Sequence, residues 1–217
     1  MAPAAAAAPD LSSLPEALRT LAARGVQRSY RKGTLIIEEG SHGDTLYLLL
    51  RGKVKAFSSD ARGREVTYGV YGAGDYFGEM SLDGGPRSAS VIAEQVCVCA
   101  VLTRQSLHEH IAAEPEFAFE LIGRVIRRAR LATQSARSMA LLDVYGRLVQ
   151  LLDSLAVVQA DGMRLIAERQ THHELAAQVG CSREMVSRLM KDLVRGGYLS
   201  VMRGSVALGP APLPPRW

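Results

Sequence analysis

Short apolar runs separated by glycines fill the first half of the chain, and this feature limits the possible folds most. The runs are Thr34 to Ile37, Thr45 to Leu50, Val54 to Phe57, Glu65 to Tyr71, Ser90 to Ala93 and Val96 to Leu102. Gly33, Gly40, Gly43, Gly52, Gly63, Gly72 and Gly74 supply turns between them. Evenly spaced short strands of this kind predict a compact antiparallel barrel or roll.

The stretch 74–91, GDYFGEMSLDGGPRSASV, interrupts this strand pattern. It places Glu79 and Arg87 on either side of a glycine-rich turn at 83–86, and Ser88 follows directly. An arginine fork matches phosphate oxygens, loop N–H groups and a hydroxyl can complete an anion site, and a carboxylate can accept a hydrogen bond from a sugar hydroxyl. We interpret the stretch as a phosphate and ribose pocket. A surface salt bridge across a tight hairpin is the alternative.

A long helical stretch follows. Thr103 is predicted to cap a short helix, and Glu114-Pro115-Glu116 begins a longer one that runs to about Met139. One face of the long helix carries Leu121, Val125, Arg128, Ala132, Ser135 and Met139, at three- or four-residue steps. We expect this face to meet its copy in a second chain, which would make the protein a homodimer through residues 114–140. Packing of this helix on its own barrel is the alternative.

The last third of the chain has the pattern of two packed helices. Thr171 and Glu174 have capping-box spacing, Gly180 ends the first helix, and Ser182 can cap a second helix that reaches Arg195. Ala176, Gly180 and Val186 have the small–glycine–apolar spacing of a helix-turn-helix. A hairpin from Tyr198 to Leu208 follows and has the pattern of a wing.

The polar side of the second helix carries Arg183, Glu184, Ser187, Arg188 and Lys191. In a major groove, arginine can fork onto guanine O6 and N7, and glutamate can accept from cytosine N4. The candidate DNA-binding residues are therefore Thr171, Ser182, Arg183, Glu184, Ser187, Arg188, Lys191 and, in the wing, Arg203. A helical hairpin with a solvated charged face is the alternative.

The composition says more about the cellular compartment of the protein than about its binding partner. The formal net charge of the 217 residues is only +4, so a nucleic-acid hypothesis depends on where the basic residues lie. The three cysteines make no even disulfide framework, the alanine-rich start lacks the basic segment of a signal peptide, and no apolar segment approaches the length of a membrane span. We expect a cytoplasmic protein with reduced thiols and no membrane partner.

The GE…RSA loop, the long helix and the helix-turn-helix reading GCSREMVSR together resemble the cAMP receptor protein / fumarate-nitrate regulator (Crp/Fnr) family over about residues 20–208. The resemblance implies an α+β fold with a jelly-roll-like antiparallel β-roll that binds a cyclic nucleotide. The implied order is a disordered tail (1–12), the β-roll (13–113), a dimerisation helix (114–140), a winged helix-turn-helix (141–208) and a second tail (209–217).

The resemblance also implies a function. It indicates a transcription regulator rather than an enzyme, with cAMP or cGMP as allosteric ligand, no metal, and double-stranded DNA and RNA polymerase as partners. Arg183, Glu184 and Arg188 fall on base-reading positions of proteins that recognise palindromic TGTGA-like half-sites. A regulator of the same fold with a vestigial pocket, which responds to another small molecule or a protein partner, is the alternative.

By the same likeness, the ligand-binding residues are Gly78, Glu79, Met80, Arg87, Ser88, Arg128, Ala132 and Thr133. Arg87 and Ser88 would hold the cyclic phosphate, and Glu79 with the backbone of Gly78 and Met80 would hold the ribose 2′-hydroxyl. Arg128 would brace the carboxylate that binds the ribose, and Thr133 would reach the purine. The position before Thr133 often carries a second hydroxyl but is Ala132 here, which leaves cAMP and cGMP both open. The loop between Glu79 and Arg87 is shorter than in the family.

Two enzyme-like readings are weaker. His108, His110 and Glu114 reproduce an HxH…E metal-ligand spacing, but the surrounding sequence predicts a helix, on which the two histidines point apart. A hydrolase with Glu79 as base would need a nucleophile or a metal beside it, and the sequence offers neither.

Overall fold

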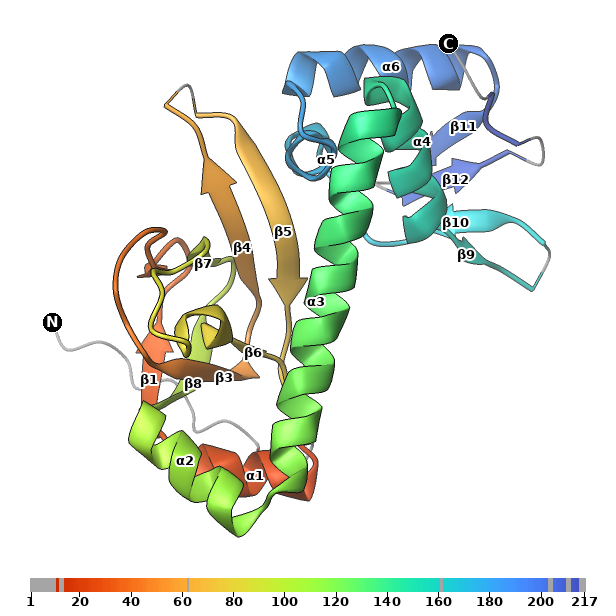
Figure 1. The fold of residues 1–217 in the computed structure, drawn as a ribbon. Coiled ribbons are helices and arrows are strands. Elements are labelled where there is room, and N and C mark those ends of the chain that lie inside the picture. The colour runs from red at the N-terminus through yellow and green to blue at the C-terminus, as the bar shows by residue number, and fades with distance from the viewer. Residues whose placement is uncertain are drawn as a thin grey trace, which may run out of the picture. The chain divides into compact units, whose positions relative to one another are not determined.

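The computed structural model describes residues 11, 14–61, 63–160, 162–202, 205–209 and 212–214 (Figure 1). The chain divides into two compact units, residues 1–58 with 67–130 and residues 59–66 with 131–217. The boundary at 130/131 lies inside a helix, whereas the predicted boundaries at 113/114 and 140/141 stay predictions. The tail predicted at 1–12 lies outside the described residues except for Leu11, which packs against the core of the first unit.

The first unit contains a β-roll of two four-stranded sheets, ordered β1-β8-β3-β6 and β2-β7-β4-β5. The strands are β1 (Val26–Tyr30), β2 (Leu35–Ile37), β3 (Leu46–Arg51), β4 (Val54–Ser59), β5 (Glu65–Tyr71), β6 (Tyr76–Phe77), β7 (Ser90–Ala93) and β8 (Cys97–Leu102). The pairs β1–β8, β3–β8, β3–β6, β2–β7 and β4–β7 are antiparallel. The predicted antiparallel roll is confirmed.

Strand β8 shows why the roll has two hydrophobic clusters. Successive side chains of a strand point to opposite faces of a sheet. Cys97 and Cys99 therefore join one cluster, with Phe77 and Val91, while Val98, Ala100 and Leu102 join the other. The near-continuous apolar sequence of this strand follows from burial on both faces.

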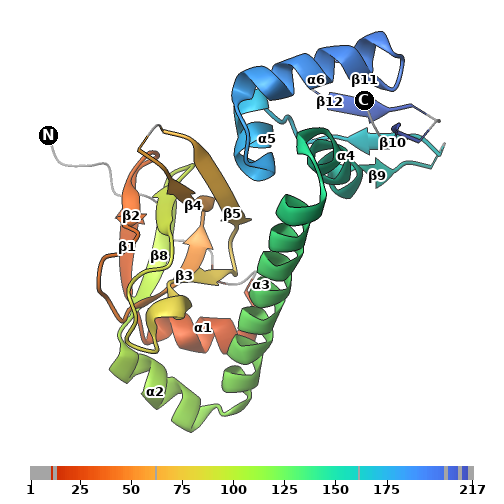
Figure 2. The same cartoon turned by 45° about the horizontal axis from the view of Figure 1, so that its top comes forward.

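Helices α1 (Glu16–Ala23) and α2 (Arg104–Ala113) lie beside each other at one end of the roll (Figure 2). Leu18 and Leu21 of α1 share a cluster with Leu107 of α2. The hydroxyl of Thr103 accepts a hydrogen bond from the Ser106 N–H, so the predicted helix cap is confirmed.

Helix α3 (Glu116–Leu141) is continuous, as predicted, but the face expected to meet a second chain is wrong over its first half. Leu121 packs against the core of its own roll, and Arg128 pairs with a carboxylate of the roll. The apolar side chains that remain exposed lie on a neighbouring face, at Phe119, Ile122 and Ile126. The helix has two adjacent apolar stripes, and the roll covers the first half of the one that the sequence pattern made more obvious.

The second unit contains a winged helix-turn-helix, as predicted. Its elements are α4 (Val144–Leu155), β9 (Val157–Val158), β10 (Arg164–Ile166), α5 (His172–Val179), α6 (Arg183–Arg195), β11 (Leu199–Met202) and β12 (Ser205–Leu208). The strands form one sheet in the order β11-β12-β10-β9. Asp143, Thr171 and Ser182 cap the three helices, and Gly180 adopts a left-handed conformation with φ 72° at the turn between α5 and α6.

The segment after the wing contributes to this unit. Within the tail predicted at 209–217, Leu213 is buried in the core formed by α4, α5 and α6. The Tyr145 hydroxyl donates a hydrogen bond of 2.8 Å to the Pro214 carbonyl oxygen. Among the residues that the structure describes, no helix is both long and apolar enough to cross a bilayer.

Candidate functional site

Arg87 is a buried cation that donates hydrogen bonds to neutral oxygens. Its side chain follows the 83–86 turn and is 6% exposed. Nη1 donates to the carbonyl oxygens of Thr45 and Gly78 at 3.1 and 2.8 Å, and Nη2 donates to the Thr45 hydroxyl at 2.9 Å. Among the described residues no carboxylate forms an ion pair with it, and burial lowers the pKa of the guanidinium.

These contacts leave one edge of the guanidinium open. The Nε–H and the second Nη2–H of Arg87 have no hydrogen-bond partner among the described residues. These two parallel N–H groups form the edge that binds two oxygens of one phosphate or carboxylate. Gly43 lies against the same edge, since a Cβ there would be 2.9 Å from Nη2 and 3.3 Å from Nε. The site is therefore built to receive an anion.

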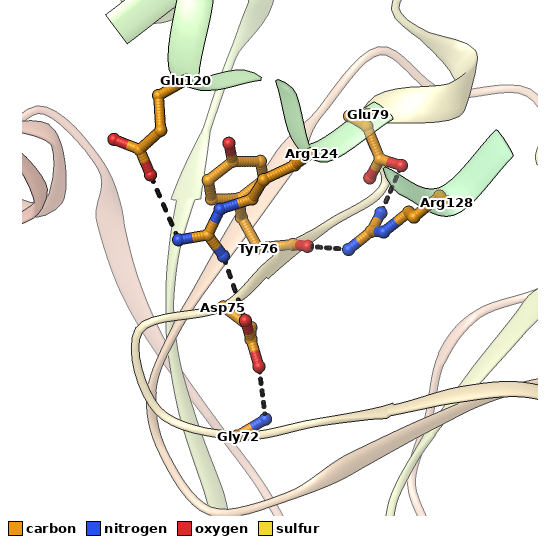
Figure 3. A network of polar contacts seen from close by, with 7 residues as sticks. All are labelled: Gly72, Asp75, Tyr76, Glu79, Glu120, Arg124 and Arg128. Carbon is orange, nitrogen blue, oxygen red and sulfur yellow. Dashed lines mark hydrogen bonds and ion pairs between the residues drawn. The ribbon is translucent and has the colours of Figure 1, made fainter. Parts of the chain in front are cut away.

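Glu79 supplies a buried carboxylate beside this cation. It follows β6 in a short 3-10 turn, and its side chain is only 2% exposed. Its Oε1 pairs with Nη1 of Arg128 from α3, while Oε2 has no partner among the described residues (Figure 3). Arg128 also donates to the carbonyl oxygen of Tyr76 and lies over the Tyr71 ring. Burial acts to lower the pKa of Arg128, but the hydrogen bond and charge of Glu79 outweigh it, so the pKa is raised.

Gly78 brings the two groups together. Its φ of 86° lies in the left-handed region, which suits glycine. A Cβ there would lie 2.8 Å from Nη1 of Arg87 and 2.9 Å from the Thr45 carbonyl oxygen. Both the backbone conformation and the space beside Arg87 therefore require a glycine.

The remaining predicted ligand residues are exposed rather than buried with Glu79 and Arg87. Met80 and Ser88 are exposed at the edge of the loop that holds Glu79 and Arg87. Ala132 and Thr133 lie one turn beyond Arg128 on α3, and both are exposed. The structure thus brings Gly78, Glu79, Arg87 and Arg128 together and leaves the other four at its surface.

Two parts of this site were missed by the sequence reasoning. Thr45 binds Arg87 through both its carbonyl and its hydroxyl, although it lies 42 residues earlier. Arg124 lies one turn before Arg128 and bridges Glu120 and Asp75, with its guanidinium over the Tyr76 ring (Figure 3). Arg124 and Arg128 are four residues apart and so lie on one helix face. This spacing was the signal that could have revealed the contact of Arg124 with Asp75.

The second candidate surface lies on α6. Arg183, Glu184, Ser187, Arg188 and Lys191 line one hollow of about 330 Å³. The two arginines, Glu184 and Lys191 are exposed, while Ser187 is half-buried and its hydroxyl lies 2.7 Å from Nδ1 of His172. Thr171 and Ser182 use their hydroxyls to cap α5 and α6. Arg203 of the predicted wing lies outside the described residues.

The HxH spacing lies on a helix, as expected. His110 of α2 is fully buried and its ring meets Phe117 edge-on, whereas His108 is exposed. Among the described residues, no group of three or more His, Cys, Asp or Glu side chains could hold a metal ion.

Comparison with known proteins assigns a domain family to each of the two parts of the chain that carry the candidate surfaces. The cyclic nucleotide-binding domain family matches residues 27–114, and the Crp-like helix-turn-helix domain family matches residues 146–208. The cAMP-activated global transcriptional regulator CRP of Haemophilus influenzae is 34% identical over 171 residues, which cover 76% of this chain and 75% of that protein. The cAMP-activated global transcriptional regulator Vfr of Pseudomonas aeruginosa is 34% identical over 185 residues, covering 81% and 85%.

Among solved structures, the c-di-GMP responsive global regulator CLP of Xanthomonas campestris aligns with a TM-score of 0.77 at 26% identity. The alignment covers 90% of this chain and 99% of that one. Relatives with the same architecture are thus named for different nucleotide signals.

Proposed function

Because this chain belongs to the Crp/Fnr family of DNA-binding transcription regulators, we propose that it is a regulator that responds to cAMP or cGMP and binds a specific DNA sequence. The observation that supports the ligand is Arg87, a buried guanidinium whose Nε/Nη2 edge has no partner among the described residues. A cyclic phosphate offers two oxygens and one negative charge to that edge, which compensates for the cost of burying the cation.

In this proposal, Glu79 binds the ribose. Its Oε2 is buried and lacks a partner among the described residues, so it can accept a hydrogen bond from the 2′-hydroxyl while Oε1 holds Arg128. Ser88, Met80 and the backbone at Gly78 complete the phosphate and ribose contacts. Ligand binding would thereby act on Arg128, and so on α3, the helix that leads directly into α4 of the DNA-binding unit.

Thr133 is the proposed purine contact, with Ala132 before it on α3. One hydroxyl at this place does not discriminate between an adenine amino group and a guanine carbonyl, because a hydroxyl can both donate and accept. Both cAMP and cGMP are therefore candidate ligands.

The protein acts as a homodimer in this proposal. Phe119, Ile122 and Ile126 recur at steps of three and four along α3 and are 70%, 52% and 45% exposed, which is the pattern of a helix seam. Two copies related by a two-fold axis would present their α6 helices to a palindromic, TGTGA-like site, with RNA polymerase as protein partner in the cytoplasm. The α6 residues Arg183, Glu184 and Arg188 would read base edges.

Titration calorimetry of the full chain with cAMP, cGMP and c-di-GMP tests the ligand. We expect binding of cAMP or cGMP to the wild type and its loss in Arg87→Leu. Arg31→Leu, which removes an exposed arginine from the same unit, should bind as the wild type does. Retention of weak, non-specific DNA affinity in Arg87→Leu would show that the variant is folded.

Absence of any cyclic-nucleotide binding by the wild type would refute the ligand proposal. The pocket would then be vestigial, and the regulator would respond to another small molecule or to a protein partner. The DNA half is tested separately: Arg183→Ala should keep nucleotide binding and lose about 1–3 kcal/mol of base discrimination.

A further inference from the structure

His172 and Ser187 join the two helices of the helix-turn-helix. His172 is the first residue of α5, and its Nδ1 lies 2.7 Å from the Ser187 hydroxyl in the second turn of α6. Both side chains are half-buried, whereas Arg183, Glu184 and Arg188 around them are exposed. A fixed hydrogen bond therefore ends in the middle of the surface that faces DNA.

Ser187 occupies the centre of that surface. Arg183 lies four residues before it, Glu184 three before it and Lys191 four after it, and residues at these separations are neighbours on one helix face. All three line the same hollow as Ser187. A base edge that enters this hollow would meet the serine hydroxyl.

The protonation of the His172 imidazole decides whether the Ser187 hydroxyl can donate a hydrogen bond to a base or only accept one. A serine hydroxyl has one proton to donate and two lone pairs. If Nδ1 of His172 is unprotonated, Ser187 donates its proton to Nδ1 and only lone pairs face the DNA. These can accept from the amino groups of cytosine N4 or adenine N6.

Protonation of the ring reverses this arrangement. Nδ1–H then donates to the serine oxygen, and the hydroxyl proton becomes free to turn toward the DNA. It can donate to guanine O6 or N7 or to thymine O4. The same serine would therefore select opposite kinds of base edge in the two states.

The groups around His172 are mainly basic. Arg169, His173 and Arg183 line the hollow next to its ring, together with Gln170 and Thr171. Glu174, on the same helix, is held in the capping box, where its carboxylate accepts from the Thr171 N–H. Besides His172, His173 is thus the one other histidine that lines this hollow.

We propose that His172 is a positioning residue for base recognition, which sets whether Ser187 presents a hydrogen-bond acceptor or a donor to DNA. The inference rests on the proposed role of α6 as the DNA-reading helix. It assigns to His172 a role in sequence preference that its place outside α6 would not suggest.

Selection from a randomised half-site library by the full-length protein tests the proposal. The selection is done with saturating cAMP, with saturating cGMP and without either, at about pH 6 and about pH 8, on either side of the ordinary histidine pKa. At the base pair that contacts Ser187, the preference should move from amino-bearing edges at the higher pH toward guanine or thymine edges at the lower pH. A change of about three- to tenfold corresponds to one hydrogen bond.

Three variants assign the effect. Ser187→Ala should bind DNA without the pH-dependent change in preference. His172→Asn can still hydrogen-bond to Ser187 but does not titrate, so it should show one preference at both pH values. His173→Ala, whose ring makes no hydrogen bond to α6 within the described part of the chain, should keep the change seen in the wild type.

A wild-type preference that is the same at both pH values, or a change that survives Ser187→Ala, would refute this inference and leave DNA recognition by α6 intact. Recovery of no preferred sequence with cAMP, with cGMP or without either would refute the role of α6 itself and this inference with it.

Discussion

Arg128 of α3 forms an ion pair with Glu79 of the loop between β6 and β7, and the carboxylate of this pair is almost completely buried. The Arg128 side chain is 22% exposed, and its guanidinium lies over the Tyr71 ring, with the guanidinium carbon 4.6 Å from the ring centroid. A helix and a loop that are far apart in the sequence are thus fixed to each other by one charge pair.

Breaking this pair from one side should be more harmful than replacing both partners. Arg128→Met leaves the Glu79 carboxylate buried without its cation and should lower the free energy of unfolding by about 3–5 kcal/mol. The double variant Arg128→Met with Glu79→Gln should lose clearly less than the sum of the two single changes. Urea unfolding followed by circular dichroism measures all three, and additive losses would contradict the pairing.

Gly78 should tolerate no side chain, in contrast to Gly84 of the same loop. Both have positive φ, but a Cβ at Gly84 meets nothing within 4 Å, whereas one at Gly78 meets Arg87 and Thr45. Gly84→Ala should therefore cost about 1 kcal/mol from backbone strain alone. Gly78→Ala should cost more and also abolish nucleotide binding, as calorimetry would show. Equal effects of the two changes would mean that the space beside Arg87 is unimportant.

The exposed stripe on α3 predicts the dimer seam. Ile126→Glu would place a carboxylate in that seam, where an unpaired charge is costly, and should give a monomer in sedimentation velocity. Gln134→Glu adds the same charge at another exposed position of α3 and should remain dimeric. A dimeric Ile126→Glu variant would place the seam elsewhere.

The burial of His110 predicts that the protein becomes less stable in acid. Burial lowers the pKa of this histidine in the folded state, and neither ring nitrogen has a hydrogen-bond partner among the described residues. Below about pH 6.5, where a histidine in the unfolded chain becomes protonated, the unfolded state binds more protons than the folded state. The free energy of unfolding should therefore fall as the pH falls below that value.

His110→Leu should remove this part of the pH dependence without loss of stability at neutral pH, because two unsatisfied polar atoms disappear. Urea unfolding between about pH 5 and pH 8 measures it. An unchanged slope in the variant would assign the acid sensitivity to other groups.

Much of the fold could be predicted because its signals are local. Helix caps depend on a side chain and an N–H two or three residues away, and Thr103, Thr171 and Ser182 all serve as predicted. Strand β1 was missed because its sequence VQRSY has no apolar alternation. It is held by pairing with β8, as in Val26 opposite Val101, which local sequence does not encode.

The part of the candidate site that lies within the 74–91 stretch could be predicted from the sequence. Glu79 and Arg87 lie within one short stretch, so their residue types and spacing indicated an anion and sugar pocket before any contact was known. The bonds from Arg87 to Thr45 and from His172 to Ser187 depend on how distant elements meet. The α3 face likewise could not be chosen from periodicity, since only the packed roll distinguishes Leu121 from Ile122.

The burial of Leu213 determines where the chain can be cut to isolate the DNA-binding unit. A polypeptide cut after residue 208, where the matched helix-turn-helix family ends, would lack a leucine of the core and the carbonyl oxygen that accepts the hydrogen bond of the Tyr145 hydroxyl. Such a fragment would expose apolar surface and lose cooperativity for reasons unrelated to DNA. Separation of the ligand-binding unit from the DNA-binding unit should therefore keep the chain at least through Pro214, because Leu213 and Pro214 contribute contacts to the DNA-binding unit.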